Sequence, residues 1–315
     1  MERRRAVLSG AFTRAHVVAL GYSAEEIRIL LRRRRWVVLR RGVYVTAEDF
    51  EAAKSDSVQF HTLQCAAVLL ALSAPHVVAG ASAARLHRFK FLNEPADEVV
   101  VLTSKPLVHG LRRDGYLLRQ APLPSEHVRV RHDLPVTSPA RTLLDLAAEL
   151  PFADAVVLAD SALHKRVVRQ AELEDVLGTS EGRPGIEKAR RSLRFADERA
   201  ESPLESVSRV ALHEGGVPTP QTQVVLDLPS GRRVRTDFFW PWVVGEADGE
   251  EKYKPTDGRS VIEVLRDERE REYELRDVGY EVVRWGWIDL WRARLVPRVL
   301  AAMERAAQRQ LGRAG

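Results

Sequence analysis

Two strand-forming runs meet at a proline within residues 233–253, and this segment constrains the fold of its region more than any other part of the sequence. β-Branched and aromatic residues on both sides of Pro241 predict an antiparallel hairpin with a two-residue turn. In that register Asp237 lies directly opposite Glu246, with Cβ atoms about 5 Å apart. Because side chains alternate between the faces of a strand, Asp248 joins Glu246 on the same face.

Three carboxylates this close repel one another unless a proton, a cation or a basic side chain compensates them. Oxygen ligands of this kind suit Mg²⁺ or Mn²⁺ better than Zn²⁺, so one hypothesis is a divalent-metal site on the hairpin. The alternative is a solvated strand face whose acids are neutralised by Arg233, Arg235 and Lys252. Charged strand faces are common in antiparallel sheets, so the hairpin alone leaves both hypotheses open.

The segments around the hairpin predict a complete small α/β domain over residues 200–310. Upstream, Ser202 and Pro203 begin a helix that places Glu205 and Arg209 on one face. The elements expected downstream are a charged helix, a short strand and a final helix, over 261–277, 279–285 and 296–307. Five of the six tryptophans lie in this region, and we expect them to pack in its core and hairpin rather than to stack on bases.

Residues 200–310 resemble a PD-(D/E)XK nuclease-type domain of the Vsr-like (very-short-patch-repair) endonucleases. The matching motifs are Glu-Ser-x-x-Arg, Asp-Phe-x-Trp-Pro, Gly-Glu-x-Asp-Gly, Lys-Tyr, Arg-x-x-x-Leu and Gly-Tyr-x-Val-x-Arg-Trp, at 205–209, 237–241, 245–249, 252–253, 271–275 and 279–285. In that superfamily carboxylates hold a metal ion that activates water for attack on a phosphodiester. The resemblance implies metal ligation by Asp237, Glu246 and Asp248. The catalytic set that it implies is Glu205, Asp237, Glu246, Asp248 and Lys252.

The sequence departs from the superfamily pattern at Asp248, because a lysine usually stands two residues after the glutamate. Another group must then help to activate the water, and Lys252 is the candidate charge stabiliser. Alternatively, the domain has kept the fold and lost the chemistry. Three alternatives follow: a DNA endonuclease, a non-cutting regulator or antitoxin built partly on a nuclease-type fold, and a nuclease that acts on RNA or on damaged bases.

Residues 1–50 predict a winged helix-turn-helix domain. A short helix over 14–20 and a glycine turn precede Ser23, which forms a capping-box pattern with Glu26 at the start of a second helix. The pattern of residues 36–45 predicts a β-hairpin, which follows the second helix as the wing does in a winged helix-turn-helix domain. This order of elements is typical of proteins that place the second helix in the major groove of DNA.

Arginine is concentrated in this N-terminal domain. Its first 45 residues contain eleven arginines and three glutamates, a net charge of +8, whereas the whole chain carries +5. Such clustering is typical of a phosphate-binding surface, although a solvated basic helix end is the plain alternative. We expect Arg28 to reach base edges and the run Arg32–Arg35 to grip phosphates. The predicted DNA-binding residues are Arg28, Arg32, Arg33, Arg34, Arg35, Arg40 and Arg41.

Most of residues 5–180 resemble the AbiEi-like antitoxins of type IV toxin–antitoxin systems. The matching phrases are Phe-Thr-Arg-Ala-His, Leu-Gly-Tyr-Ser, Arg-Trp-x-x-Leu-Arg-Arg-Gly-Val-Tyr, Ser-Ala-Ala-x-Leu-His and Leu-Pro-Val-Thr-Ser-Pro-Ala-Arg-Thr-Leu-Leu-Asp-Leu-Ala, which start at 12, 20, 35, 82 and 134. The resemblance implies a transcriptional repressor that acts on its own promoter, with DNA and a cognate toxin protein as partners. Strand and helix patterns in the middle segment, 58–195, predict a mixed α/β domain.

The chain as a whole is expected to be an α+β or α/β multidomain protein of the cytoplasm. Its single cysteine, Cys65, fits a reducing compartment and lies in an apolar run too short to span a bilayer, and no signal peptide precedes it. Arg141 and Asp145 have the i,i+4 spacing of a surface or domain-interface ion pair. The histidines lack the spacing of a zinc site. A homodimer would double the phosphate contacts of a single winged helix.

Overall fold

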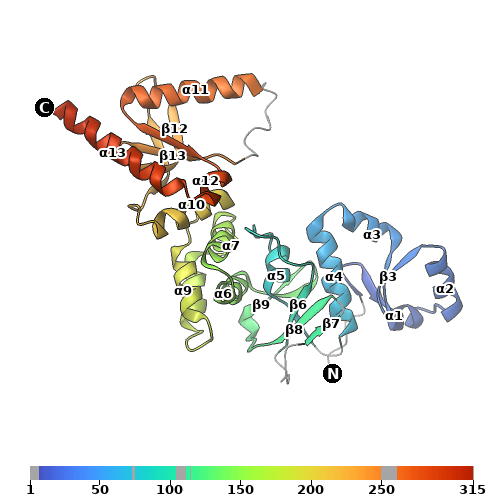
Figure 1. The fold of residues 1–315 in the computed structure, drawn as a ribbon. Coiled ribbons are helices and arrows are strands. Elements are labelled where there is room, and N and C mark those ends of the chain that lie inside the picture. The colour runs from blue at the N-terminus through green and yellow to red at the C-terminus, as the bar shows by residue number, and fades with distance from the viewer. Residues whose placement is uncertain (1–6, 73–74, 104–110, 114, 250–260, 315) are drawn as a thin grey trace. The chain divides into compact units, whose positions relative to one another are not determined.

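The computed structural model describes residues 7–72, 75–103, 111–113, 115–249 and 261–314 (Figure 1). The chain divides into two compact units. Unit 1 consists of residues 1–158 and 165–195, and unit 2 consists of residues 159–164 and 196–315. Each unit combines helices with β-sheet, so the chain is a mixed α/β protein with more than one folded unit. In the described part of the chain, no helix has both the length and the apolar character needed to cross a membrane.

The N-terminal part of unit 1 contains two short helices and a four-stranded sheet of order β1-β2-β4-β3. Its elements are β1 (Val7–Leu8), β2 (Ala11–Thr13), α1 (Arg14–Ala19), α2 (Ala24–Arg32), β3 (Trp36–Arg40) and β4 (Val43–Thr46). The predicted capping box is present at the start of α2. Ser23 Oγ accepts from the Glu26 amide at 3.2 Å, and the Glu26 carboxylate accepts from the Ser23 amide at 2.8 Å.

Unit 1 continues with a six-stranded sheet of order β7-β8-β6-β5-β10-β9 and the helices around it. The elements are α3 (Ala47–Lys54), α4 (Ser57–Ala71), β5 (Val77–Val78), α5 (Gly80–Leu86), β6 (Val99–Thr103), β7 (Leu111–Arg113), β8 (Tyr116–Gln120), a 3₁₀ turn (Ser125–His127), β9 (Val128–Arg131), β10 (Leu134–Thr137), α6 (Pro139–Glu149), α7 (Phe152–His164), α8 (Gln170–Gly178) and α9 (Ile186–Phe195). Ser138 caps α6 and Pro139 is its first residue, the usual pattern for a capping serine followed by proline.

One hydrophobic core holds the two sheets of unit 1 together. Helix α4 lies between them and contacts strands of both (Figure 1). Leu63 and Val68 of α4 pack in one cluster with Val45 of β4 and Val101 of β6. Cys65 is fully buried in this cluster, and burial raises the pKa of its thiol to about 12, as expected for a structural cysteine. The N-terminal and middle segments therefore share one core, although the sequence suggested two separate domains.

Unit 2 is a four-stranded sheet with helices on both faces (Figure 1). Its elements are α10 (Pro203–Glu214), β11 (Gln221–Asp227), β12 (Arg233–Trp240), β13 (Val243–Ala247), α11 (Val261–Val278), β14 (Glu281–Trp285), α12 (Trp287–Trp291) and α13 (Leu295–Ala314). The strand order is β11-β12-β13-β14, in which β13 and β14 are parallel and the other pairs are antiparallel. Helices α10, α12 and α13 pack over the face that bears Phe238, and α11 packs over the face that bears Val234 and Val244.

The tryptophans of unit 2 divide between the core and the surface. Trp240 and Trp285 are buried, and each indole N–H donates to an oxygen at 2.7 Å. A Cβ on Gly245 would lie 2.5 Å from the Trp285 ring, so glycine is required there. In contrast, Trp242 exposes 40% of its surface and Trp291 exposes 75%. The sequence favoured packing in the core or the hairpin for all five, and the exposure of Trp291 on α12 departs from that expectation.

A buried ion pair connects α7 and α10 within unit 2. Arg209 Nη1 lies 2.9 Å from Asp160 Oδ2, and the two side chains are only 11% and 1% exposed. The Asp197 amide also donates to Asp160 at 2.7 Å. Burial raises the pKa of Asp160 from an ordinary 3.8 to about 6, although the charge of Arg209 opposes this shift. Asp160 therefore depends on Arg209 to remain ionised inside unit 2.

Candidate functional sites

Helix α2 has one buried face and one charged face. Ile27 is 1% exposed and packs with Val17 and Tyr44, which fixes α2 against α1 and the sheet. Arg28 lies on the exposed surface, where it forms an ion pair with Glu25. Exposed pairs of this kind contribute less than about 1 kcal/mol, so Arg28 can exchange Glu25 for another anion at small cost.

Consecutive arginines surround the end of α2 and all of them are exposed: Arg32, Arg33, Arg34 and Arg35. Arg33 caps the helix, and Arg34 turns the chain with φ +54° before β3 begins. Arginine stays protonated throughout the physiological pH range, so this turn has a fixed positive charge. Such a concentration of like charge favours a polyanionic partner.

Arg40 and Arg41 occupy the turn between β3 and β4 but have different surroundings. The Arg40 guanidinium lies 5.2 Å from the centroid of the Tyr116 ring in β8, whereas Arg41 is exposed. Arg14 also lies at this turn, because its amide donates to the Gly42 carbonyl at 2.8 Å. Arg40 therefore holds the turn against the six-stranded sheet, while Arg14 and Arg41 are exposed. Arg14 was absent from the predicted contact set because the pairing of β2 with β4 that brings it here is non-local.

The β12–β13 hairpin has the predicted register, with Trp240 opposite Val243. The side chain of Asp237 bonds to the backbone of the neighbouring strand: its Oδ2 accepts from the Ala247 amide at 2.8 Å. This bond holds the Asp237 carboxylate at the end of β13. A backbone amide thus supplies part of the compensation that the sequence assigned to a metal ion or to basic side chains.

Arginines from two other elements compensate the remaining acids of the hairpin. Glu246 is 3% exposed and accepts a hydrogen bond from Arg271 of α11. Asp248 lies just beyond β13, and its Oδ2 is 3.5 Å from Nη1 of Arg284 in β14. Burial alone would lower the pKa of Arg284, but the charges of Asp248 and of the glutamates around it raise it above the ordinary value. Arg271 and Arg284 are thus the cations next to these carboxylates.

Two of the three basic residues expected beside the hairpin carboxylates have other partners. Arg233 lies 3.1 Å from Asp227, and Arg235 lies 2.8 Å from Glu201. Lys252 lies outside the described residues. Charge compensation therefore comes from different arginines than the sequence suggested, because the pairing of β13 with β14 and the packing of α11 decide which cations approach.

Glu205, the helix-borne member of the predicted catalytic set, is buried among neutral donors. Its carboxylate accepts from the Glu201 amide at 3.0 Å, the Ser202 hydroxyl at 2.7 Å and the Gln223 side chain at 3.0 Å. Burial raises the pKa of Glu205, and the nearby charge of Asp237 raises it further. Gln223 has φ +55°, a strained conformation of the kind that occurs at functional sites, and sequence pattern gave no sign of it.

The donor set of unit 2 does not fit a divalent cation in the arrangement observed. Among the described residues, no three histidine, cysteine, aspartate or glutamate side chains are grouped so that they could hold a metal ion. Glu246 and Asp248 face arginines, and Asp237 is bonded to a backbone amide. The geometry is that of an acidic cluster compensated by arginine.

Arg141 and Asp145 form the ion pair that their spacing predicts, and it is buried rather than on the surface, one of the two locations expected. Arg141 is 1% exposed, and its Nε donates to both Asp145 oxygens at 2.9 and 2.8 Å. Its Nη1 donates to the Pro122 carbonyl at 2.8 Å, and Arg183 contacts Asp145 at 2.7 Å. The pair therefore connects α6 to the segment after β8, which contains Pro122, and to the segment before α9, which contains Arg183.

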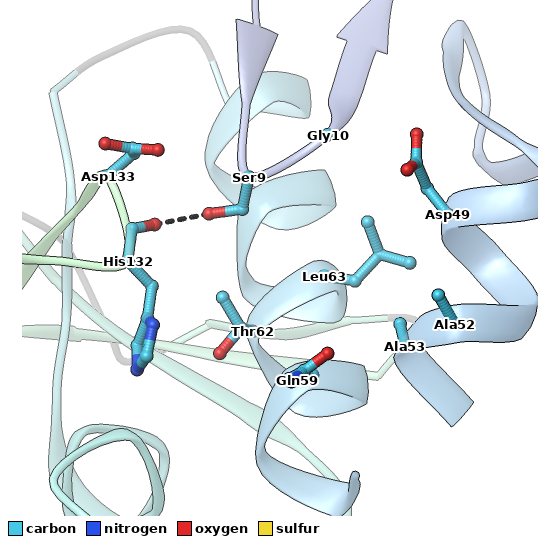
Figure 2. Close-up of a pocket in the computed structure, with 10 residues that line it drawn as sticks. All are labelled: Ser9, Gly10, Asp49, Ala52, Ala53, Gln59, Thr62, Leu63, His132 and Asp133. Atoms are coloured by element: carbon cyan, nitrogen blue, oxygen red, sulfur yellow. Dashed lines mark hydrogen bonds between the residues drawn. The ribbon is translucent and has the colours of Figure 1, made fainter. Parts of the chain in front are cut away.

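A pocket of about 380 Å³ lies where the N-terminal sheet of unit 1 meets α3, α4 and the β9–β10 turn (Figure 2). The residues that line it are Ser9, Gly10, Asp49, Ala52, Ala53, Gln59, Thr62, Leu63, His132 and Asp133. Ser9 donates to the His132 carbonyl across one side of the pocket. The Asp49 amide donates to the Thr46 hydroxyl oxygen at 3.1 Å, which caps α3. Ser9 thus connects two walls of the pocket, whereas Asp49 and Thr62 bond within their own helices.

Comparisons with known proteins identify a matching family and proteins similar to this chain. Residues 13–195 match the AbiEi antitoxin C-terminal domain family. Two curated proteins of Mycobacterium tuberculosis, uncharacterized protein MT2308 (strain CDC 1551 / Oshkosh) and uncharacterized protein Rv2248 (strain ATCC 25618 / H37Rv), are each 32% identical over 173 residues. The alignment covers 54% of this chain and 62% of each relative, so the chain spans less than two thirds of their length. The crystal structure of the RV2827C protein from Mycobacterium tuberculosis is 20% identical with a TM-score of 0.42, and the match covers 58% of this chain and 71% of that one.

The family match ends at residue 195 and does not reach the segment 200–310. The resemblance of that segment to Vsr-like endonucleases finds no support in these comparisons. The match includes α1, α2, the exposed arginines and the six-stranded sheet, and it covers more than half of the chain. The chain therefore belongs to the AbiEi antitoxin C-terminal domain family.

Proposed function

We propose that the protein is a DNA-binding regulator of a type IV toxin–antitoxin system, with a cognate toxin protein as its partner. The observation that supports DNA binding best is the exposed run Arg32–Arg35 at the end of a capped helix that is packed firmly against its sheet. Membership of the antitoxin family supports the biological class.

In this proposal the N-terminal part of unit 1 acts as a winged helix. Helix α2 enters the major groove, where Arg28 leaves Glu25 for a base edge and Arg32–Arg35 contact phosphates. The β3–β4 hairpin is the wing. Its exposed Arg41, together with Arg14, contacts the DNA backbone. Arg41 is separated from the end of α2 by the length of β3, about 16 Å for five residues.

Arg40 has a different role from the one its sequence position suggests. Its guanidinium rests on Tyr116 of the six-stranded sheet, which ties the wing to the rest of unit 1. A fixed wing keeps Arg41 and the arginines of α2 at a constant separation. This reduces the ordering cost of DNA binding, because the contacts are arranged in advance. A homodimer would present two such surfaces and double the number of phosphates contacted.

The salt dependence of duplex DNA affinity tests this proposal. At least four phosphates contacted by arginine give a slope of log K against log [salt] of about −3.6 or steeper. Fluorescence anisotropy with a labelled duplex, measured between about 0.05 and 0.2 M salt, gives this slope. Binding that is absent, or that does not change with salt, would refute the proposed interface.

A second candidate function is phosphodiester hydrolysis by a PD-(D/E)XK-type domain in unit 2. The hairpin register supports it, because β12 and β13 bring Asp237 and Glu246 to one end of the sheet with Glu205 nearby. The described carboxylates face Arg271 and Arg284, and they are not grouped so that they could hold Mg²⁺ or Mn²⁺ in this arrangement.

Calorimetry with Mn²⁺ and Mg²⁺ separates this second candidate from a unit without catalysis. From the observed arginine contacts we expect no metal binding and no nicking of supercoiled plasmid by the wild-type protein, and no change in either for Asp237→Ala. Metal binding and nicking that both disappear in Asp237→Ala would instead establish an endonuclease whose site lies on the hairpin.

A further inference from the structure

Helix α12 exposes the largest apolar side chain on the described surface of unit 2. Trp291 is 75% exposed, and the neighbouring Ile288 is 47% exposed. The Trp291 ring stacks on the ring of Trp287, with centroids 6.3 Å apart and planes inclined by 23°. An indole that stays exposed in the folded state contributes little to the free energy of folding. Two neighbouring exposed apolar side chains on one short helix indicate a binding surface.

The stacked tryptophans lie at the same end of the sheet as the carboxylates. Helix α12 starts directly after β14, whose Trp285 carbonyl accepts from the Asp248 amide at 2.8 Å. A Cβ on Gly286, the residue before α12, would lie 3.3 Å from the Asp248 carbonyl. The tryptophan pair thus lies beside the carboxyl ends of the parallel strands β13 and β14, next to the cluster formed by Asp248 and Arg284.

Positive charge borders the exposed tryptophan. Arg292 and Arg294 follow Trp291 in the chain and are both exposed. The acidic residue of α12, Asp289, is already engaged: it accepts from the Gly286 amide at 3.1 Å and from Arg298 at 2.8 Å. The exposed charged residues that directly follow Trp291 in the chain are therefore cationic, and the carboxylate of α12 is already paired.

We propose that Trp287 and Trp291 form a stacking platform for the bases of single-stranded nucleic acid, with Arg292 and Arg294 at its backbone phosphates. Every base has a flat π face, so an exposed indole binds any sequence, and flanking cations hold the connecting phosphates. A protein partner would also bury Trp291, but the two exposed arginines that follow it in the chain favour a polyanion. This site is distinct from the duplex-binding surface proposed for unit 1.

Tryptophan fluorescence during titration with oligodeoxythymidylate of about 12 nucleotides tests the platform. Stacking on Trp291 quenches its emission, and Trp291→Ala is expected to weaken binding by about 5- to 150-fold, the loss of one stacked base. The matched control is Trp242→Ala, which removes the other exposed tryptophan of unit 2 from the β12–β13 turn and should leave affinity unchanged. Both substitutions remove exposed rings, so circular dichroism should show intact folds.

Equal affinity of Trp291→Ala and the wild type for the oligonucleotide would overturn the platform. An equal loss of oligonucleotide affinity in Trp291→Ala and Trp242→Ala would overturn it too. The same holds if the wild type self-associates, and Trp291→Ala abolishes this self-association without changing oligonucleotide binding. Duplex affinity measured on the same proteins keeps the two proposals apart. Absence of salt-dependent duplex binding would refute the interface formed by the arginines of unit 1. An effect of Trp291→Ala on single-stranded DNA alone would support the platform on α12.

Discussion

Replacement of Arg33, Arg34 and Arg35 by alanine is expected to weaken duplex DNA binding on the order of 500-fold at 0.1 M salt. Each phosphate contact contributes about 0.9 to the slope of log K against log [salt], so three lost contacts change the slope by about 2.7. All three side chains are exposed, and the variant should keep the stability of the wild type. Anisotropy titrations at several salt concentrations measure both the affinity and the slope.

The matched control removes the same number of charges elsewhere in unit 1. Arg166, Arg169 and Arg190 lie near α8 and α9, which pack against α6 and not against α2. Their replacement by alanine lowers the net charge equally but should change affinity much less. If both triple variants lose affinity alike, net charge rather than the α2 surface attracts DNA, and the proposed interface is wrong.

Arg209→Leu is expected to destabilise unit 2 by about 3–5 kcal/mol, because it leaves the buried carboxylate of Asp160 without its cation. The loss in free energy of unfolding caused by Arg209→Leu should depend on pH. The folded pKa of Asp160 is raised from 3.8 to about 6, so protonation favours the folded state below this range, and that stability is lost as pH rises through about 6. Without Arg209 the pKa rises further, and the variant should lose most relative to the wild type above about pH 6.

Urea unfolding at pH 5 and at pH 8 measures this deficit in free energy of unfolding. The double variant Asp160→Leu/Arg209→Leu removes both charges, and it should recover most of the stability lost in the single variant. Equal destabilisation at both pH values, or a double variant as unstable as Arg209→Leu, would show that packing of the Arg209 side chain matters rather than its charge.

Local chemistry was predictable from sequence because it depends on residues a few positions apart. The capping box of Ser23 and Glu26, the cap of α6 at Ser138 and the register of the hairpin around Pro241 all lie within a short stretch of chain. In each case the geometry follows from one turn of helix or one tight turn. The positions of these elements were correct for that reason.

Contacts between distant segments were not predictable in the same way. Arg271 reaches Glu246 only because α11, which connects the parallel strands β13 and β14, packs on the sheet, and neither residue type nor spacing predicts this contact. Arg40 is a DNA-binding candidate by its position in a basic turn, yet the fold of unit 1 places it on Tyr116. The exposure of Trp291 was missed since α12 is too short for a hydrophobic period to show which side is buried.

Footprinting of the full chain on the DNA directly upstream of its own coding sequence is the most direct measurement of regulation by this protein. A regulator that binds through Arg32–Arg35 protects a defined stretch of that DNA. The protection should disappear when Arg33, Arg34 and Arg35 are replaced by alanine, and it should persist when Arg166, Arg169 and Arg190 are replaced. Absence of protection, together with equal affinity for this DNA and for an unrelated duplex of the same length, would contradict a role as a specific DNA-binding regulator.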